Sequence, residues 1–262
     1  MLSVWKAAVI LRRFVTAMQL HGVDFSGADN GGKHTIRIAT LKSPTEITVE
    51  RADRGALLRM ILASAKSADQ HLWRVDAASG MPLGTLKAHA IDANWLAAAR
   101  WSAATASPRG WRTQLRLISR EEPRRTADNE ARTPMAPMNL RVFKATWTFL
   151  CEVLLPLHEA GISIAPVAPT RSNATVCEGN STSVLYRLGF PTRGYKGEGD
   201  PPKRVRALIA RRLEEAGIPI STALMQHAVA DTEGDILDAL ILLTPPLHTV
   251  VPAEAAVEGW VY

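Results

Sequence analysis

The first third of the chain contains a run of short strand-like segments, whose order constrains the fold more than any other feature of the sequence. Residues 34–42 and 46–52 alternate apolar and polar side chains, and residues 19–24 precede them as another short segment. The links between the three are short, and their residues, such as Ser43 and Pro44, are typical of tight turns. The pattern predicts an antiparallel meander of three strands.

A helix and a fourth strand are predicted directly after the meander. Residues 54–68 carry apolar side chains at the spacing that only a helix brings to one face. These are Leu57, Leu58, Ile61, Leu62 and Ala65. Residues 71–76 suit a short buried strand that ends on an acid. The order predicts an α/β protein with a mixed sheet, in which an antiparallel meander and parallel strands are flanked by helices.

Residues from about 85 to 160 are expected to form a helical insertion. Helices are predicted at 93–104, with Asp92 as the N-cap, and at 111–118. Apolar residues then recur at intervals of three and four between 140 and 157, which predicts one long helix with its stripe in the core. The stripe comprises Leu140, Phe143, Trp147, Leu150, Leu154 and Leu157.

The last third of the chain returns to mixed structure. Strands are predicted at 162–167 and 174–178, and helices from Ser181 onward, at 201–217 and at 235–243. The helix at 201–217 begins on Pro and ends on Gly, the usual asymmetry of helix ends. Its predicted buried residues are Val205, Leu208, Ile209 and Leu213. Its basic residues, predicted to point outward, are Lys203, Arg204, Arg206, Arg211 and Arg212.

Composition limits the class of protein. The 262 residues include 31 Lys and Arg against 25 Asp and Glu, a net charge of +6, and 47% are hydrophobic, as in a globular protein with a sizeable core. We expect one domain at 19–262 and an N-terminal extension at 1–18. Cys151 and Cys177 are too few for a disulfide framework, and no apolar run is long enough to span a membrane. These features predict a cytoplasmic protein without a membrane partner.

Acidic residues stand where predicted strands end. Asp24 closes the first strand, Asp76 the fourth, and Glu178 a later one. A carboxylate at the end of a buried strand is costly unless a cation pairs with it. Asp235 and Asp238 lie three residues apart on one face of the last helix. Because the ends of parallel strands share one edge of a sheet, four or five of these carboxylates are expected to meet there.

A cluster of carboxylates favours a hard divalent cation. Oxygen ligands suit Mg²⁺ or Mn²⁺, and the lack of His and Cys pairs argues against zinc. Two ions about 4 Å apart would flank a scissile phosphate, so the predicted reaction is phosphodiester hydrolysis. The expected metal ligands are Asp24, Glu178, Asp235 and Asp238, with Asp76 assisting. Taken singly, Asp76 and Asp235 also suit helix caps or surface ion pairs.

Basic residues gather in the insertion and on the helix at 201–217. Both groups could follow a phosphate backbone, and a solvated helix face would give the same pattern. Tyr195 and Lys196 are more specific, because they stand in a turn flanked by Gly194 and Gly197. A lysine held in that turn is expected to meet a phosphate near the acids.

Several short motifs, taken in order, resemble the domain of unknown function 429 family, described as predicted nucleases of the ribonuclease H-like fold. The matching pieces include residues 22–28 (GVDFSGA), Val75–Asp76, 80–84 (GMPLG), Arg125, Thr133–Pro134, 139–141 (NLR), Cys177–Glu178, 194–197 (GYKG), 234–239 (GDILDA) and 258–260 (EGW). Family members usually follow the acid of the fourth strand with Pro-Phe-Gly. Here residues 77–80 (AASG) stand in that place.

The resemblance implies a ribonuclease H-like mixed sheet with a helical insertion. It also implies that the acids at the strand ends and on the last helix resemble the metal ligands of ribonuclease H-like and junction-resolving enzymes. Arg125, Asn139 and Arg141 belong to the family pattern, and together with Lys196 and Tyr195 they are the expected substrate-binding residues.

We therefore expect a Mg²⁺- or Mn²⁺-dependent nuclease that acts on nucleic acid. A non-catalytic nucleic-acid-binding or regulatory protein of the same fold is a second interpretation, and it predicts binding without metal. A phosphotransferase or ATPase is a third, because residues 24–27 resemble the first phosphate loop of actin-like ATPases. Those proteins need a duplicated domain with a second such loop, for which 262 residues leave no room. A homodimer stays open and would allow two strands to be cut.

Overall fold

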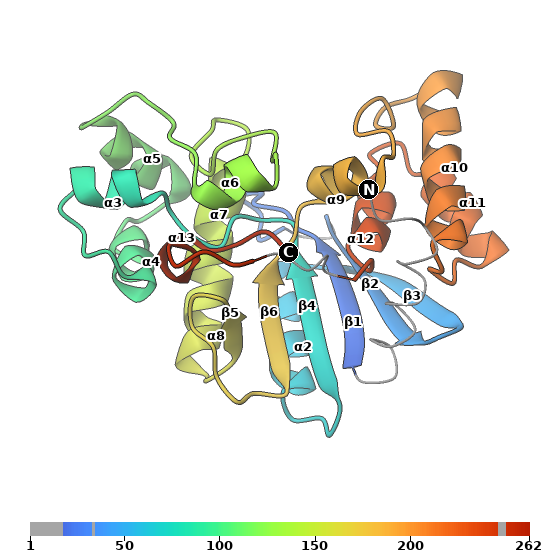
Figure 1. The fold of residues 1–262 in the computed structure, drawn as a ribbon, viewed down its shortest axis with the longest axis horizontal. Coiled ribbons are helices and arrows are strands. Elements are labelled where there is room, and N and C mark those ends of the chain that lie inside the picture. Colours follow the sequence, from blue (N-terminus) through green and yellow to red (C-terminus); the bar gives the residue numbers. More distant parts are fainter. Residues whose placement is uncertain (1–17, 33–34, 246–249) are drawn as a thin grey trace.

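A mixed sheet forms the centre of the molecule (Figure 1). The structure is a computed structural model that describes residues 18–32, 35–245 and 250–262. Residues 1–17 of the predicted extension at 1–18 lie outside the described residues, as does His34, whereas Met18 opens β1. Within them, the sheet has six strands in the order β3-β2-β1-β4-β6-β5.

The strands combine an antiparallel meander with parallel additions, as the sequence predicted. Their bounds are β1 Met18–Asp24, β2 Ile36–Ser43, β3 Glu46–Ala52, β4 Gln70–Val75, β5 Ser163–Ala165 and β6 Ala174–Glu178. β2 pairs antiparallel with both β1 and β3, whereas β4 runs parallel to β1 and to β6, and β5 parallel to β6. The carboxyl ends of β1, β4 and β6 therefore point to the same edge of the sheet.

The helices between β4 and β5 form the expected insertion, with corrections in detail. Their bounds are α3 Leu83–Ala88, α4 Trp95–Ala103, α5 Pro108–Arg116, α6 Thr126–Glu130, α7 Phe143–Thr148, the π-helical η1 Phe149–Leu154 and α8 Leu155–Glu159. The prediction of Asp92 as a cap was wrong, because the Asn94 side chain accepts a hydrogen bond from the Ala97 amide and begins α4. Leu140 was wrongly placed in the stripe: it precedes α7 and is 65% exposed.

Six further helices complete the described part of the fold. Their bounds are α2 Arg54–Ser64, α9 Ser181–Leu188, α10 Asp200–Glu215, α11 Thr222–Ala230 and α12 Asp235–Ile241, followed by the short α13 Ala255–Glu258. The Asn180 side chain caps α9 by accepting a hydrogen bond from the Ser183 amide. Two residues of α10 differ from prediction, since Arg206 is only 2% exposed whereas Leu208 is 39% exposed. The described helices are all too short or too polar to cross a membrane.

Two hydrophobic cores lie on the two faces of the sheet. One core packs α2, α4 and the helix from α7 to α8 against side chains such as Val23 and Trp73. The other packs α9 to α12 against side chains such as Leu20 and Leu41. In Figure 1 the helices α3–α6 lie on one side of the carboxyl ends of β1, β4 and β6 and the helices α9–α11 on the other. The edge of the sheet formed by these carboxyl ends therefore lies between the two groups of helices.

Gly22 allows α12 to lie directly against β1. A Cβ atom at this position would come within 2.1 Å of the carbonyl oxygen of Ala239 and 2.9 Å of the Cβ of Leu242. A side chain would therefore force the helix off the strand. The close approach brings the first turn of α12, with Asp235 and Asp238, over the end of β1, where Asp24 stands.

We predict that Gly22→Ala lowers the free energy of unfolding by about 3 kcal/mol, because the added methyl group overpacks a rigid contact with backbone. Urea denaturation followed by circular dichroism measures the change. Gly84→Ala is the matched control: its added Cβ meets no atom within 4 Å, and it lies in α3, where alanine favours the helix. Equal stability of Gly22→Ala and wild type would contradict the close approach of α12 to β1.

Candidate functional site

A cavity of about 620 Å³ opens at the carboxyl ends of β1, β4 and β6. Residues of the insertion, between Thr133 and Thr146, form one wall, and residues of α9, of the turn at 195–196 and of α12 form the other. All five predicted acids line the cavity: Asp24, Asp76, Glu178, Asp235 and Asp238. The sheet topology brings them together because three of them end or follow neighbouring parallel strands.

The carboxylates of this cavity act on one another electrostatically. Burial raises the pKa of Asp24 well above its usual range, and the charges of Asp238, Asp235 and Asp76 raise it further. Burial and the charge of Asp238 likewise raise the pKa of Asp76 to about 6. The pKa of Asp235 is raised by burial and by the charge of Asp231. Removing these carboxylates from water and placing them close together disfavours their charged forms. Carboxyl groups with pKa values raised in this way are characteristic of functional sites.

Asp238 is held by the two residues of the glycine-flanked turn. The Nζ atom of Lys196 lies 2.7 Å from its Oδ2 atom, and the Tyr195 hydroxyl donates to its Oδ1 atom at 2.8 Å. Burial lowers the pKa of Lys196, but the attraction of Asp238 outweighs it and the net pKa is raised. The Lys196 side chain stays 52% exposed and lines the cavity while it pairs with this acid.

Arg206 of α10 holds the turn at residues 195–197 in place through hydrogen bonds, a role that the sequence analysis missed. Its Nη1 atom donates to the carbonyl oxygens of Tyr195 at 2.7 Å and Gly197 at 2.9 Å, and its Nε atom donates to that of Val229 at 2.8 Å. The residues before and after Lys196 are thereby tied to α10. Spacing could have revealed this, because position 206 is three residues before the buried Ile209 and shares its helix face.

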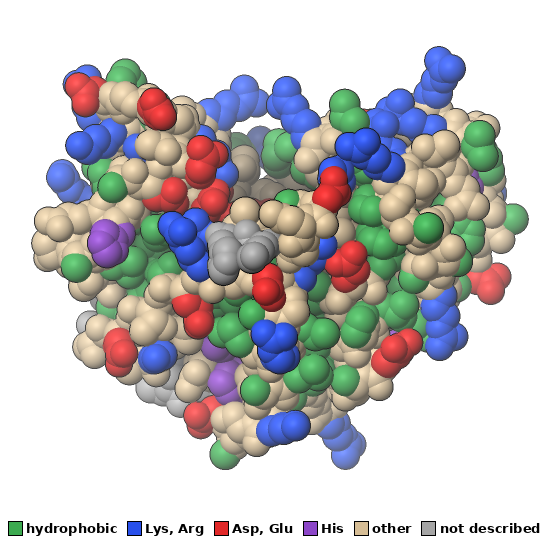
Figure 2. All heavy atoms as spheres, turned by 180° about the vertical axis from the view of Figure 1, so that it is seen from behind, with side chains coloured by type: hydrophobic (Ala, Val, Ile, Leu, Met, Phe, Trp, Pro, Cys, Tyr) green, Lys and Arg blue, Asp and Glu red, His purple; other side chains and the backbone are tan. Residues whose placement is uncertain are grey.

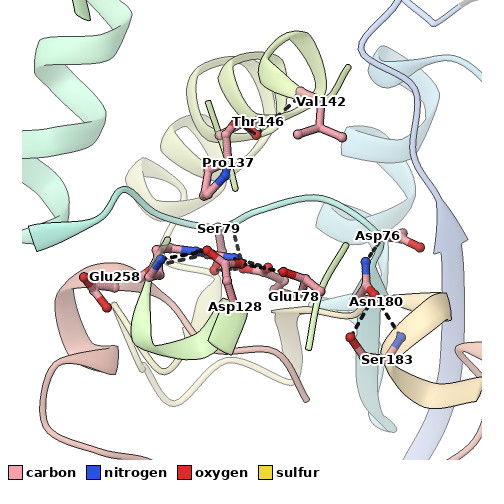
Figure 3. A network of polar contacts seen from close by, with 12 residues as sticks. Asp76, Ser79, Asp128, Pro137, Val142, Thr146, Glu178, Asn180, Ser183 and Glu258 are labelled. Carbon is pink, nitrogen blue, oxygen red and sulfur yellow. Dashed lines mark hydrogen bonds and ion pairs between the residues drawn. The ribbon is translucent and has the colours of Figure 1, made fainter. Parts of the chain in front are cut away.

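Asp76 anchors the start of α9. Its Oδ2 atom accepts hydrogen bonds from the amide of Ser181 at 3.0 Å and from its hydroxyl at 2.8 Å, and its Oδ1 atom accepts one from the Asn180 side chain at 3.2 Å. Figure 3 shows Asp76 facing Asn180, whose own side chain caps the helix at Ser183. Asp76 therefore does not cap a helix that follows it in the sequence, because Asn180 is the N-cap of α9, but it binds the start of that helix at the wall of the cavity.

Glu178 takes part in a buried ion-pair network. Arg125 donates to Oε1 from Nη2 at 2.6 Å and to Oε2 from Nη1 at 2.7 Å, and it also pairs with Asp128 at 2.8 Å. The amide and hydroxyl of Ser79 both donate to Oε2 (Figure 3). Ser79 belongs to the loop at residues 77–80, directly after β4. The metal role of Glu178 stays a prediction, while its contacts favour a structural role.

The three remaining residues that were expected to bind substrate, Arg125, Asn139 and Arg141, lie in different surroundings. Arg125 is 1% exposed and is satisfied by Glu178 and Asp128. Arg141 lines the cavity and is exposed. The Asn139 side chain donates to Glu122 at 2.8 Å, on the side of α5, where Glu122 also pairs with two arginines. Of the three, Arg141 is the side chain that can reach a ligand in the cavity.

The donor set suits a divalent cation, although the side chains are not gathered into a complete binding site. In the described parts of the chain, no three His, Cys, Asp or Glu side chains are placed so that they could hold a metal ion. Mg²⁺ commonly binds through one or two carboxylates, with water and substrate phosphate supplying the other oxygens. Asp24, Asp235 and Asp238 offer only oxygen and line the same cavity, so their chemistry fits such an ion.

Comparisons of the chain with protein-family models, with curated proteins and with solved structures found no match. The structure itself defines an α/β protein with a mixed sheet and an acid-lined cavity at the carboxyl ends of its parallel strands. The assignment of function therefore rests on the residues of this cavity.

We predict that Asp24→Asn raises the free energy of unfolding at pH 7.5, by about 0.5 to 2 kcal/mol as is common for stabilising substitutions. The pKa of Asp24 is raised in the folded state, so this carboxyl favours folding at low pH, and that contribution is lost as the pH rises through its folded pKa. The gain from Asn should accordingly shrink as the pH falls toward 4. Urea denaturation at several pH values measures it.

Asp29→Asn is the control for this experiment. Asp29 is exposed and pairs with Lys144 at 2.7 Å, which lowers its pKa, so its replacement should not stabilise the protein. A loss of stability in Asp24→Asn at pH 7.5 would contradict the mutual repulsion of the acids.

We predict the opposite change for Glu178→Gln, a fall of about 3 kcal/mol in the free energy of unfolding, because it leaves the buried Arg125 short of a charged partner. Glu122→Gln serves as the control. Glu122 pairs with arginines at a more exposed position, so its loss should cost about 1 kcal/mol or less. If Glu178→Gln stabilised the protein as Asp24→Asn does, Glu178 would belong to the repelling acids instead.

Proposed function

We propose that this protein is a Mg²⁺- or Mn²⁺-dependent nuclease with a ribonuclease H-like fold. The observation that carries the proposal is the placement of Asp24, Asp235 and Asp238 around one cavity at the carboxyl edge of the sheet. The antiparallel meander followed by parallel strands and helices supports it, since the resemblance to the domain of unknown function 429 family implies this arrangement.

One or two of these three acids would hold the metal, with water and substrate phosphate supplying the other oxygens, and each acid has a reason to accept it. Asp24 and Asp235 carry raised pKa values, so a nearby cation would favour their ionised forms. Asp238 is buried and already held in place by Tyr195. When bound, the metal would polarise the phosphate and lower the pKa of the attacking water. The reaction converts one phosphodiester and one water into a phosphate monoester and an alcohol.

The protein's own cations would orient the substrate. Lys196 faces the cavity from one wall and Arg141 from the other, so both can donate to phosphate oxygens. Figure 2 shows Lys and Arg side chains along the upper rim of the molecule, on both sides of a hollow. With a net charge of +6, this distribution supports a polyanionic substrate such as nucleic acid.

A non-catalytic nucleic-acid-binding protein is the second candidate. The observation in its favour is that Lys196 already pairs with Asp238, an arrangement that needs no metal ion. It predicts that binding of nucleic acid persists in the presence of a chelator. The cleavage experiment separates the two candidates.

We predict that the purified protein cleaves at least one member of a panel of labelled single-stranded, duplex and branched DNA and RNA in the presence of Mn²⁺. Cleavage should stop with chelator and fall by about 100-fold or more in Asp24→Asn. Asp29→Asn should cleave like wild type. Retention of nucleic acid without cleavage, unchanged by chelator and by Asp24→Asn, would contradict the nuclease and support the binding protein.

A further inference from the structure

Arg132 and Tyr186 form an exposed pair of side chains beside the cavity. The guanidinium of Arg132 lies over the ring of Tyr186, 4.5 Å from its centroid, and donates a hydrogen bond to its hydroxyl. We infer that this pair is a stacking platform for an unpaired base, so that the nucleic acid entering the cavity is single-stranded. The inference rests on the proposed function and narrows it to one class of substrate.

The two residues come from opposite walls of the cavity. Tyr186 belongs to α9 and lies one turn after Thr182, which lines the cavity, so the two side chains share one face of the helix. Arg132 follows α6 and directly precedes Thr133, a residue of the other wall. Figure 1 shows α6 and α9 on the two sides of the carboxyl ends of the parallel strands. The pair therefore continues both walls outward from the cavity.

Tyr186 presents an aromatic ring to solvent at this place. Its exposed fraction is 48%, and among the large apolar side chains that are exposed in the described parts of the chain, it is the aromatic one. A single exposed apolar residue is ordinary on a protein surface. An exposed ring that is covered on one side by an arginine, next to a cavity, is the arrangement that single-strand-binding proteins use.

The backbone of Arg132 is held in an unusual conformation. Its φ of +54° lies in the left-handed region, which residues other than glycine seldom adopt. The turn is imposed by its neighbours: the Thr133 amide and the Arg124 side chain both donate to the carbonyl oxygen of Asp128 at 3.0 Å. Strain of this kind persists where the surrounding structure enforces it, often at binding sites. It supports a functional reason for the position of the guanidinium over the ring.

The chemistry of the pair selects an unpaired base. Aromatic rings and guanidinium planes stack on the faces of bases with little regard to sequence. In a duplex those faces are covered by the neighbouring base pairs, and only the base edges are reached through the grooves. Within the described residues, the Arg132 side chain donates to the Tyr186 hydroxyl alone, which leaves N–H groups for an adjacent phosphate. Arg141 and Lys196 offer further cations for the same strand inside the cavity.

Fluorescence anisotropy tests the platform without any assay of cleavage. The probes are labelled oligothymidylate and oligouridylate of about 12 nucleotides, a length within the site sizes of single-strand-binding folds. Each titration is run with chelator and with Ca²⁺. We expect Tyr186→Ala to weaken binding by about 5-fold or more, because one stacking surface is lost. Tyr186→Phe keeps the ring and should bind like wild type. So should Leu208→Ala, which changes an exposed apolar residue of α10.

Two further probes separate stacking from a purely structural role of Tyr186. The first is an oligomer of the same length that is abasic at every position. Wild type should bind it more weakly than oligothymidylate, whereas Tyr186→Ala should lose most of this difference. The wild-type comparison stays informative even if the variant does not fold. The second is a duplex of the same length, whose binding should be the same in wild type and Tyr186→Ala.

The outcomes distinguish this inference from the proposed function. If wild type bound the abasic oligomer as tightly as oligothymidylate, or if Tyr186→Ala weakened all probes equally or none, the platform would be overturned while a nuclease stayed possible. In the case of equal weakening, the pair would only tie the two walls together. If folded wild type bound no probe with chelator or with Ca²⁺, both the inference and the proposed function would be overturned.

Discussion

The contact of α12 with β1 at Gly22 is the constraint on which the site depends. It lets a helix that begins with two acids lie over a strand that ends with a third. The arrangement is unfavourable electrostatically, because Asp24, Asp235 and Asp238 repel one another. It is maintained by apolar packing, since Leu237, Leu240 and Ile241 of α12 are fully buried in the core on that face of the sheet. Burial of these apolar side chains thus offsets the electrostatic repulsion among the three acids. The same concentration of negative charge would attract a cation to the cavity.

The acids at the edge of the sheet divide into two groups according to their partners. Glu178 and Asp76 are satisfied by the protein, the first through Arg125 and the second through the start of α9, and they hold the walls in position. Asp24 and Asp235 face the cavity with raised pKa values. Asp238 lies between the groups because its partner, Lys196, is itself open to the cavity. Glu178 and Asp76 therefore fix the walls of the cavity that Asp24, Asp235 and Asp238 line.

Local sequence patterns predicted a strand or its end correctly where the residues of that one segment are enough to decide its structure. Alternation of apolar residues marked β3, and the acids at the ends of β1 and β6 were identified because each follows a short apolar run. Short helices without a clear apolar stripe, such as α3 and α6, were missed. Asp92 was predicted as the cap of α4, where the structure has Asn94, because both residue types suit a cap and only the local geometry decides which of them is used.

Pairings between distant residues could not be predicted in the same way. The ion pair between Arg125 and Glu178 joins residues 53 positions apart. A single sequence does not show that an arginine in the insertion pairs with a glutamate at the end of a strand. Arg206 was predicted to point outward with the other basic residues of its helix, although its position relative to Ile209 put it on the buried face. Tertiary contacts, not propensity, set the roles of these residues.

Location of the metal in a crystal is the most direct test of the central claim, that Asp24, Asp235 and Asp238 form a divalent-cation site. Anomalous diffraction from crystals soaked in Mn²⁺ measures it. The account predicts an anomalous peak within the cavity, bonded to oxygens of these acids. A peak at Glu178 alone, or no peak in the cavity at full Mn²⁺ saturation, would contradict it.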